Sequence, residues 1–185
     1  MDAAQHSFVK EKEQYPVKLF FQDEGRFGRI NNIQKCWFVK GSRPQVKQQM
    51  IREYIYAYSS VCPQTGETFS LIMPTADGAS MQYYMDEMSR HFNEARIILC
   101  MDNAAWHKAE DINMPDNMIS WFLPPYSPEL NPVEILWKHI RVNYFNNRTF
   151  ESLDEVETQL VEALMDVYNS KTDIAALTLF NWMDF

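Results

Sequence analysis

Three acidic residues of this 185-residue chain carry side chains that could do phosphoryl-transfer chemistry if the fold brings them together. Asp23 and Asp102 each end an apolar run with strand-like composition, and Glu134 lies in the first turn of a predicted helix. Converging carboxylates repel one another unless cations neutralise them, and Mg²⁺ is a hard cation that prefers oxygen ligands. Two such ions can stabilise the attacking and the leaving oxygen of a phosphodiester displacement. The three acids are therefore candidate metal ligands.

Each acid also has an ordinary structural interpretation. An Asp at the end of a strand often accepts backbone hydrogen bonds in a turn. Glu134 could be the reciprocal partner of Asn131 in a helix capping box. Glu24 follows Asp23 and points to the opposite face of its strand, so only one of the two is a candidate ligand. Taken singly, none of these residues establishes a mechanism.

The elements that would position these acids follow from the hydrophobic pattern. Strands are predicted at 17–24, 52–62, 67–74, 95–102 and 118–124, and the turn at 63–66 makes the second and third a hairpin. Helices are predicted over 79–92, from Pro132 to about Phe145, and after a capping box that opens at Ser152. Residues 25–46 are rich in turn formers, although CWFV at 36–39 could pair as a short strand. This order predicts an α/β fold with a mixed sheet and helices on its faces.

The helix after Asn131 places charged residues next to Glu134. Asn131 fits the N-cap and Pro132 the first helical position. Glu134, Lys138 and Arg141 share one face, which suits a phosphate backbone running along it. The alternative is a weak Glu–Lys pair on a solvated helix. The adjoining stripe is expected to be core, and it consists of Val133, Trp137, Ile140 and Tyr144.

The net charge of -8 is unusual for a protein that would bind DNA. The charge is unevenly distributed, because residues 25–52 contain seven basic residues and no acid, whereas residues 149–185 contain eight acids and one Lys. The total still predicts weak DNA binding by this chain alone. Three widely spaced cysteines indicate a reducing compartment and argue against a structural zinc site, and no apolar run is long enough to span a bilayer.

Three stretches of the sequence resemble the DDE transposases of bacterial insertion sequences, in the branch related to the mariner elements. They are FFQDEGRFG (20–28), ILCMDNAAWHKA (98–109) and LPPYSPELNPVEILWKHIR (123–141), and the resemblance covers residues 17–147. The third stretch is the most specific, because a long proline-punctuated run ending in NPVE and a Trp has little chance of recurring by accident. The 31 residues between Asp102 and Glu134 are slightly fewer than is usual in that family.

The resemblance implies an RNase H-like fold, a five-stranded mixed sheet flanked by helices. It makes Asp23, Asp102 and Glu134 the catalytic and metal-binding triad, with two Mg²⁺ ions for which Mn²⁺ can substitute. The implied activity is Mg²⁺-dependent phosphodiester hydrolysis and strand transfer at transposon ends, with transposon-end and target DNA as partners. Candidate DNA contacts are Arg26, Arg29, Asn103, His107, Lys138 and Arg141, whereas Trp106, Trp121 and Tyr126 are expected to be packing residues.

The same resemblance sets expectations for organisation and partners. Residues 1–16 are expected to be a flexible lead-in and residues 17–185 the catalytic domain. Relatives carry N-terminal helix-turn-helix modules, so sequence-specific recognition is expected from such a module, in cis or on a separate chain. A homodimer and a bacterial cytoplasmic, nucleoid-associated location are expected, with no membrane partner. The alternatives are a non-catalytic RNase H-like module that binds DNA or protein, a carboxylate-based glycosidase, and a junction resolvase.

Overall fold

A computed structural model describes residues 15–42, 45–103 and 112–183. The strands are β1 (Val17–Ile30), β2 (Met50–Cys62), β3 (Glu67–Met73), β4 (Arg96–Met101) and β5 (Met118–Phe122). The helices are α2 (Gly78–His91), α3 (Pro132–Ile140), α4 (Leu153–Asn169) and α5 (Lys171–Thr178), with a short 3-10 turn η2 (Pro128–Leu130) and a π-helical turn η3 (Arg141–Phe145). Within these ranges, no helix is long and apolar enough to cross a bilayer.

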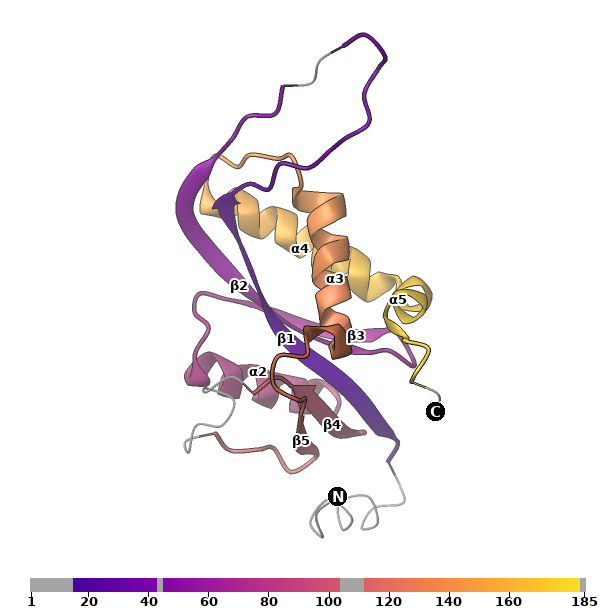
Figure 1. The fold of residues 1–185 in the computed structure, drawn as a ribbon. Coiled ribbons are helices and arrows are strands. Elements are labelled where there is room, and N and C mark those ends of the chain that lie inside the picture. The colour runs from indigo at the N-terminus through magenta and orange to yellow at the C-terminus, as the bar shows by residue number, and fades with distance from the viewer. Residues whose placement is uncertain (1–14, 43–44, 104–111, 184–185) are drawn as a thin grey trace.

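The five strands form one mixed sheet in the order β3-β2-β1-β4-β5 (Figure 1). The long β1 strand lies at its centre, antiparallel to β2 and parallel to β4. The hairpin of β2 and β3 extends the sheet on one side, and β5 extends it on the other, parallel to β4. The predicted five-stranded mixed sheet is confirmed.

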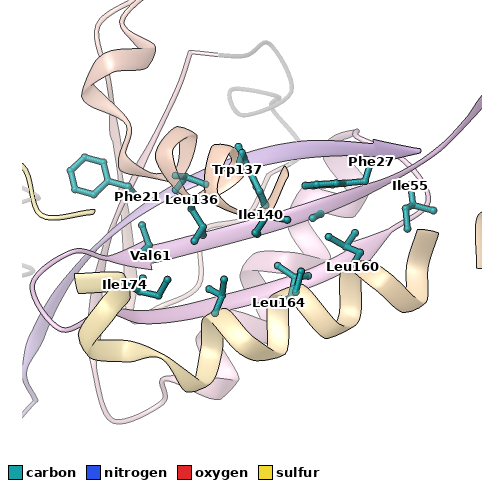
Figure 2. Packing of buried hydrophobic residues seen from close by; sticks show 14 of the residues in the cluster. Phe21, Phe27, Ile55, Val61, Leu136, Trp137, Ile140, Leu160, Leu164 and Ile174 are labelled. Carbon is teal, nitrogen blue, oxygen red and sulfur yellow. The ribbon is translucent and has the colours of Figure 1, made fainter. Parts of the chain in front are cut away.

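Helices cover both faces of the sheet. Neighbouring residues of β1 point to opposite faces, and each face has its own hydrophobic core. On one face Phe20 packs with Met81, Tyr84 and other buried residues of α2. On the opposite face Phe21 and Phe27 join the buried side chains of α3, α4 and α5. Figure 2 shows Trp137 and Ile140 of α3, and Leu160 and Leu164 of α4, gathered against these strands. The central strand therefore joins the two layers.

The prediction for residues 25–46 was partly wrong, because its first part continues β1. Gly25 pairs with Ala57 and Gly28 with Tyr54 in the antiparallel ladder. A Cβ on Gly25 would lie 2.9 Å from ring atoms of Trp137. Glycine is therefore needed here so that α3 can approach the strand, and it does not mark a turn. The short strand at 36–39 does not form. The described residues between β1 and β2, 31–42 and 45–49, project from the body of the protein (Figure 1), and Trp37 there is fully exposed.

The helix starts agree with their capping signals. Ser152 caps α4 by accepting a hydrogen bond from the Glu155 N–H, as the capping box predicts. α5 was not predicted: its short amphipathic pattern follows α4 after one residue, and the helix packs on the β2–β3 turn. Gly66 in that turn has a φ of 69°, and an added Cβ would lie 1.8 Å from the Lys171 carbonyl oxygen. The expected lead-in at 1–16 falls almost entirely outside the described residues.

Candidate active site

The register of β1 and β4 places Asp23 beside Asp102. The parallel pairing runs from Val17 with Arg96 to Phe21 with Cys100, so the residues two positions further on are the two acids. Asp102 directly follows the last residue of β4. Asp23 lies in the middle of β1 rather than at its end, because β1 continues alongside β2 after β4 has stopped. The turn interpretation of Asp23 is therefore wrong, and the sheet itself fixes its position.

Glu134 is brought to the same place by Asn131, a buried side chain that makes two contacts. Its Oδ1 accepts a hydrogen bond from the Val133 N–H at 3.1 Å, which caps α3, and its Nδ2 donates to the Gln22 carbonyl oxygen at 3.0 Å. The start of α3 is thereby tied to β1 at the residue before Asp23. The backbone N–H of Asn131 donates to the Pro128 carbonyl oxygen at 3.0 Å. That donor is thus already satisfied, so the capping-box interpretation of Glu134 is not supported.

The three acids line one cavity of about 400 Å³. The 123–128 loop closes one side of it, and Asn103 and Asn131 contribute amide groups to the wall. Asn103 is held in place because its Nδ2 donates to the Leu123 carbonyl oxygen at 2.5 Å. Three elements far apart in the sequence therefore supply carboxylates to a common space.

The carboxylate of Asp23 has a strongly perturbed acidity. Burial, followed by the negative charges of Glu134 and Glu24, raises its pKa from 3.8 to about 7. A hydrogen bond from the Trp137 indole Nε1–H to Asp23 Oδ2, at 2.9 Å, partly offsets this rise. Because the charge of Glu134 contributes to this rise in pKa, a cation between the two carboxylates would relieve the cost of ionising both.

The chemistry of the donor set suits Mg²⁺ or Mn²⁺, because all three charged side chains offer hard oxygen ligands inside one cavity. The three carboxylates do not form a coordination site for a single ion in this structure. Among the described residues, no three His, Cys, Asp or Glu side chains are close enough together to hold an ion.

The candidate DNA contacts are not all brought to this cavity. Asn103 lines it, and the exposed Lys138 lies one turn of α3 beyond Glu134. Arg29 forms an ion pair with Glu53 at 2.8 Å and donates to the Phe150 carbonyl oxygen. The guanidinium groups of two further candidates lie over aromatic rings, Arg26 over Tyr54 and Arg141 over Phe27. His107 lies outside the described residues, and the DNA contacts stay predictions.

The structure gives Trp137 and Asn131 contacts at the site that the sequence pattern does not reveal, and it places Tyr126 on the cavity wall. Trp137 was assigned to the core, and it is indeed buried, but its indole N–H also holds Asp23. Asn131 was identified only as a helix cap. Tyr126 was expected to be a packing residue, yet its side chain is fully exposed on the cavity wall. Its backbone φ is 59°, in a region that residues other than glycine rarely adopt. Trp121 is also substantially exposed, and Trp106 falls outside the described residues.

Comparison with known proteins agrees with this geometry. Residues 18–157 match the family model described as DDE superfamily endonuclease. An uncharacterized protein of Sinorhizobium fredii, y4pE/y4sA, is 35% identical over 130 residues, which are 70% of this chain and 96% of that protein.

Solved structures of the Mos1 transposase share the fold. A pre-cleavage Mos1 transpososome matches with a TM-score of 0.61 and 14% identity, over 95% of this chain and 60% of the Mos1 chain. A Mos1 mariner paired-end complex with Mn matches with a TM-score of 0.56 and 16% identity, over 88% of this chain and 56% of that chain. This chain thus spans less than two thirds of the Mos1 chains, and its sheet and helices have the RNase H-like fold of their catalytic domain. The chain belongs to the DDE superfamily endonucleases.

Proposed function

We propose that this chain is the catalytic domain of a DNA transposase that cuts phosphodiesters at transposon ends and joins the freed ends to target DNA. The observation that carries the proposal is that Asp23, Asp102 and Glu134, from three separate elements, line one cavity. These carboxylates would hold two Mg²⁺ ions, and Mn²⁺ would substitute. The family match and the fold shared with Mos1 transposase support this assignment.

The proposed reaction has two displacements at one site. Water attacks a phosphodiester at the transposon end, the P–O bond to the 3′-oxygen breaks, and that oxygen leaves as a 3′-hydroxyl. This hydroxyl then attacks a target phosphodiester, forming one P–O bond and breaking another. When bound, divalent cations lower the pKa of the attacking oxygen and offset charge on the phosphate. No side chain of the cavity is then required as general base.

The chain's own residues would position the reacting groups. The sheet register fixes Asp23 against Asp102, and Trp137 orients the Asp23 carboxylate through its indole N–H. Asn131 sets where α3 begins and therefore where Glu134 projects. The exposed Lys138 follows one turn later and can attract the DNA backbone. These contacts would hold the carboxylates in place, and binding of the ions and the substrate phosphate would complete the active site.

Recognition of particular transposon ends would come from a helix-turn-helix module, in cis or on a separate chain. Pairing of two ends would require two catalytic domains, which a homodimer supplies. The net charge of -8 supports the need for a basic partner, because phosphate affinity depends on Lys and Arg. The protein would act on DNA in the bacterial cytoplasm, at the nucleoid.

A second candidate is a non-catalytic module descended from a transposase. One observation favours it: the three acids share a cavity, but within the described residues no set of three acidic, His or Cys side chains closes around an ion position. In that case the fold would serve in binding DNA or protein. Metal binding distinguishes the two candidates directly.

The test is calorimetric titration of Mg²⁺ and Mn²⁺ into the wild-type chain and into a triple variant, Asp23→Ala, Asp102→Ala and Glu134→Ala. We expect saturable binding to the wild type and none to the variant, provided circular dichroism shows that both are folded. An Asp116→Ala variant serves as control, because Asp116 is an exposed acid outside the cavity. Equal metal binding by the wild type and the triple variant would reject the triad.

A further inference from the structure

A second cavity, of about 570 Å³, adjoins the candidate active site and shares Pro128, Asn131 and Glu134 with it. Glu134 therefore borders both spaces. Ile135 of α3 and Phe180, which follows α5, supply the apolar wall of the second cavity. A strand of DNA whose phosphate reaches Glu134 would place an adjacent nucleotide at this opening.

Phe180 lines the cavity and offers an aromatic stacking surface there. Its side chain is half-buried and packs against the core cluster that includes residues of α3 and α4. Its ring centroid lies 5.6 Å from that of Trp182, with an interplanar angle of 33°. An aromatic ring fixed from behind loses little conformational freedom when a base stacks on it.

The charges of the cavity favour a base over a phosphate in its interior. Glu129 is in the lining, away from the proposed metal ions, and its carboxylate would repel a phosphate, whereas a neutral base carries no charge to repel. A carboxylate can also accept a hydrogen bond from an exocyclic amino group of a base. Lys138 is the cation of the lining, and its exposed ammonium group suits a phosphate at the rim.

We propose that this cavity holds an unpaired base next to the phosphodiester being cut, stacked on Phe180, with Lys138 against a neighbouring phosphate. The inference rests on the proposed function, because it takes the acids of the adjoining cavity as the place where the phosphodiester lies. Contacts from α3 and from the segment after α5 would then determine how far the DNA strand extends past Glu134. Phe180 and Lys138 are thus positioning residues for the substrate strand.

The test titrates the 185-residue chain into a short single-stranded oligonucleotide that carries one 2-aminopurine, at low salt with Ca²⁺. We expect saturable binding with quenching of the 2-aminopurine fluorescence, and a weaker signal with the fully paired duplex. Phe180→Leu keeps an apolar side chain but removes the aromatic face, so it should weaken binding about tenfold and abolish the quenching. Phe180→Tyr should restore both.

Two further variants sharpen the test. Leu179→Ala alters the exposed neighbour of Phe180, which does not line the cavity, and should bind and quench as the wild type does. Lys138→Gln should lower affinity and reduce the slope of log affinity against log salt by roughly 0.7, the value for one phosphate contact to a single strand. Thermal melting of each variant checks that it is folded.

The outcomes separate this inference from the proposed function when plasmid nicking in Mg²⁺ is measured alongside. If Phe180→Leu binds and quenches like the wild type, or the wild type gives no stacking signal, the base cavity is refuted. Triad-dependent nicking in that case would leave the proposed function standing. Stacking on Phe180 by a wild type that binds no metal and nicks no DNA would instead reject the catalytic proposal and retain the cavity.

Discussion

Replacing Asp23 by Asn should stabilise the metal-free protein at alkaline pH while removing a metal ligand. The Asp23 side chain is partly buried beside the charges of Glu134 and Glu24, and its pKa is raised from 3.8 to about 7. The folded protein therefore binds this proton more tightly than the unfolded chain does. The resulting stability is fully present below about pH 4 and is lost as pH rises towards 7.

The size of the effect follows from the pKa difference. A rise of about three units, at 1.36 kcal/mol per unit, gives a ceiling of about 4 kcal/mol at pH 8. Partial solvent access and relaxation around the charge reduce this to roughly 1–3 kcal/mol. For a chain of this size that corresponds to a rise in melting temperature of about 2–12 °C. Asn retains an oxygen that can accept the Trp137 indole N–H, so the packing around the site is preserved.

The assay is thermal and urea unfolding in EDTA at pH 4.5 and pH 8. Asp23→Asn should exceed the wild type by much less at pH 4.5, where the folded wild type keeps this carboxyl protonated, than at pH 8, where the folded and the unfolded chains both ionise it. Asp116→Asn controls for the general loss of one negative charge from a chain of net charge -8, because Asp116 is exposed. Adding Mg²⁺ at pH 8 should stabilise the wild type more than Asp23→Asn. If Asp23→Asn is no more stable at pH 8 than Asp116→Asn, the Asp23 carboxylate does not destabilise the metal-free fold when it ionises.

Three further predictions concern the surroundings of the site. Trp137→Phe removes the N–H that lowers the pKa of Asp23, so the pH dependence of Mn²⁺ binding should shift to higher pH. Phe27→Leu disturbs the same packing but keeps the donor, and an equal shift in that variant would contradict the role of the hydrogen bond. Gly66→Ala should lower the free energy of unfolding, measured in urea, by more than ~1 kcal/mol while metal affinity is unchanged, because Gly66 has a φ of 69° and the added Cβ would meet a backbone oxygen. Undiminished stability would show that the turn can relax. Leu160→Ala should cost about 2–5 kcal/mol in the same assay, since its side chain is fully buried between α4 and the sheet, and a loss well below this range would mean that the core closes around the gap.

The fold was predictable where periodicity and capping signals agree. Asn131 and Pro132 marked the start of α3, and Ser152 marked the start of α4, because these residue types satisfy the first free N–H groups of a helix. The length of β1 was not predictable, because Gly25 and Gly28 are typical of turns in isolation. Their place in a strand depends on the close approach of Trp137 and of the β2 backbone, which only the assembled fold reveals.

The candidate site was predictable as a set of residue types and not as a geometry. Asp23 and Asp102 stood out because each follows an apolar run, and the parallel register of β1 and β4 explains why they meet. Nothing local in the sequence shows that Asn131 reaches the Gln22 carbonyl oxygen or that Trp137 donates to Asp23, because these pairs are 109 and 114 residues apart. Long-range contacts of this kind depend on how α3 packs against the sheet.

The central claim is that Asp23, Asp102 and Glu134 act together in metal-dependent cutting of DNA. Nicking of supercoiled plasmid, in Mg²⁺ or Mn²⁺ and with EDTA as blank, tests it most directly when wild type, Asp102→Asn and Asp116→Asn are compared at equal concentration. Asp102 lines the cavity, whereas Asp116 lies outside it. We expect metal-dependent nicking by the wild type and Asp116→Asn and none by a folded Asp102→Asn. Nicking retained in Asp102→Asn, or absent from the folded wild type, would show that the three acids are not the catalytic triad.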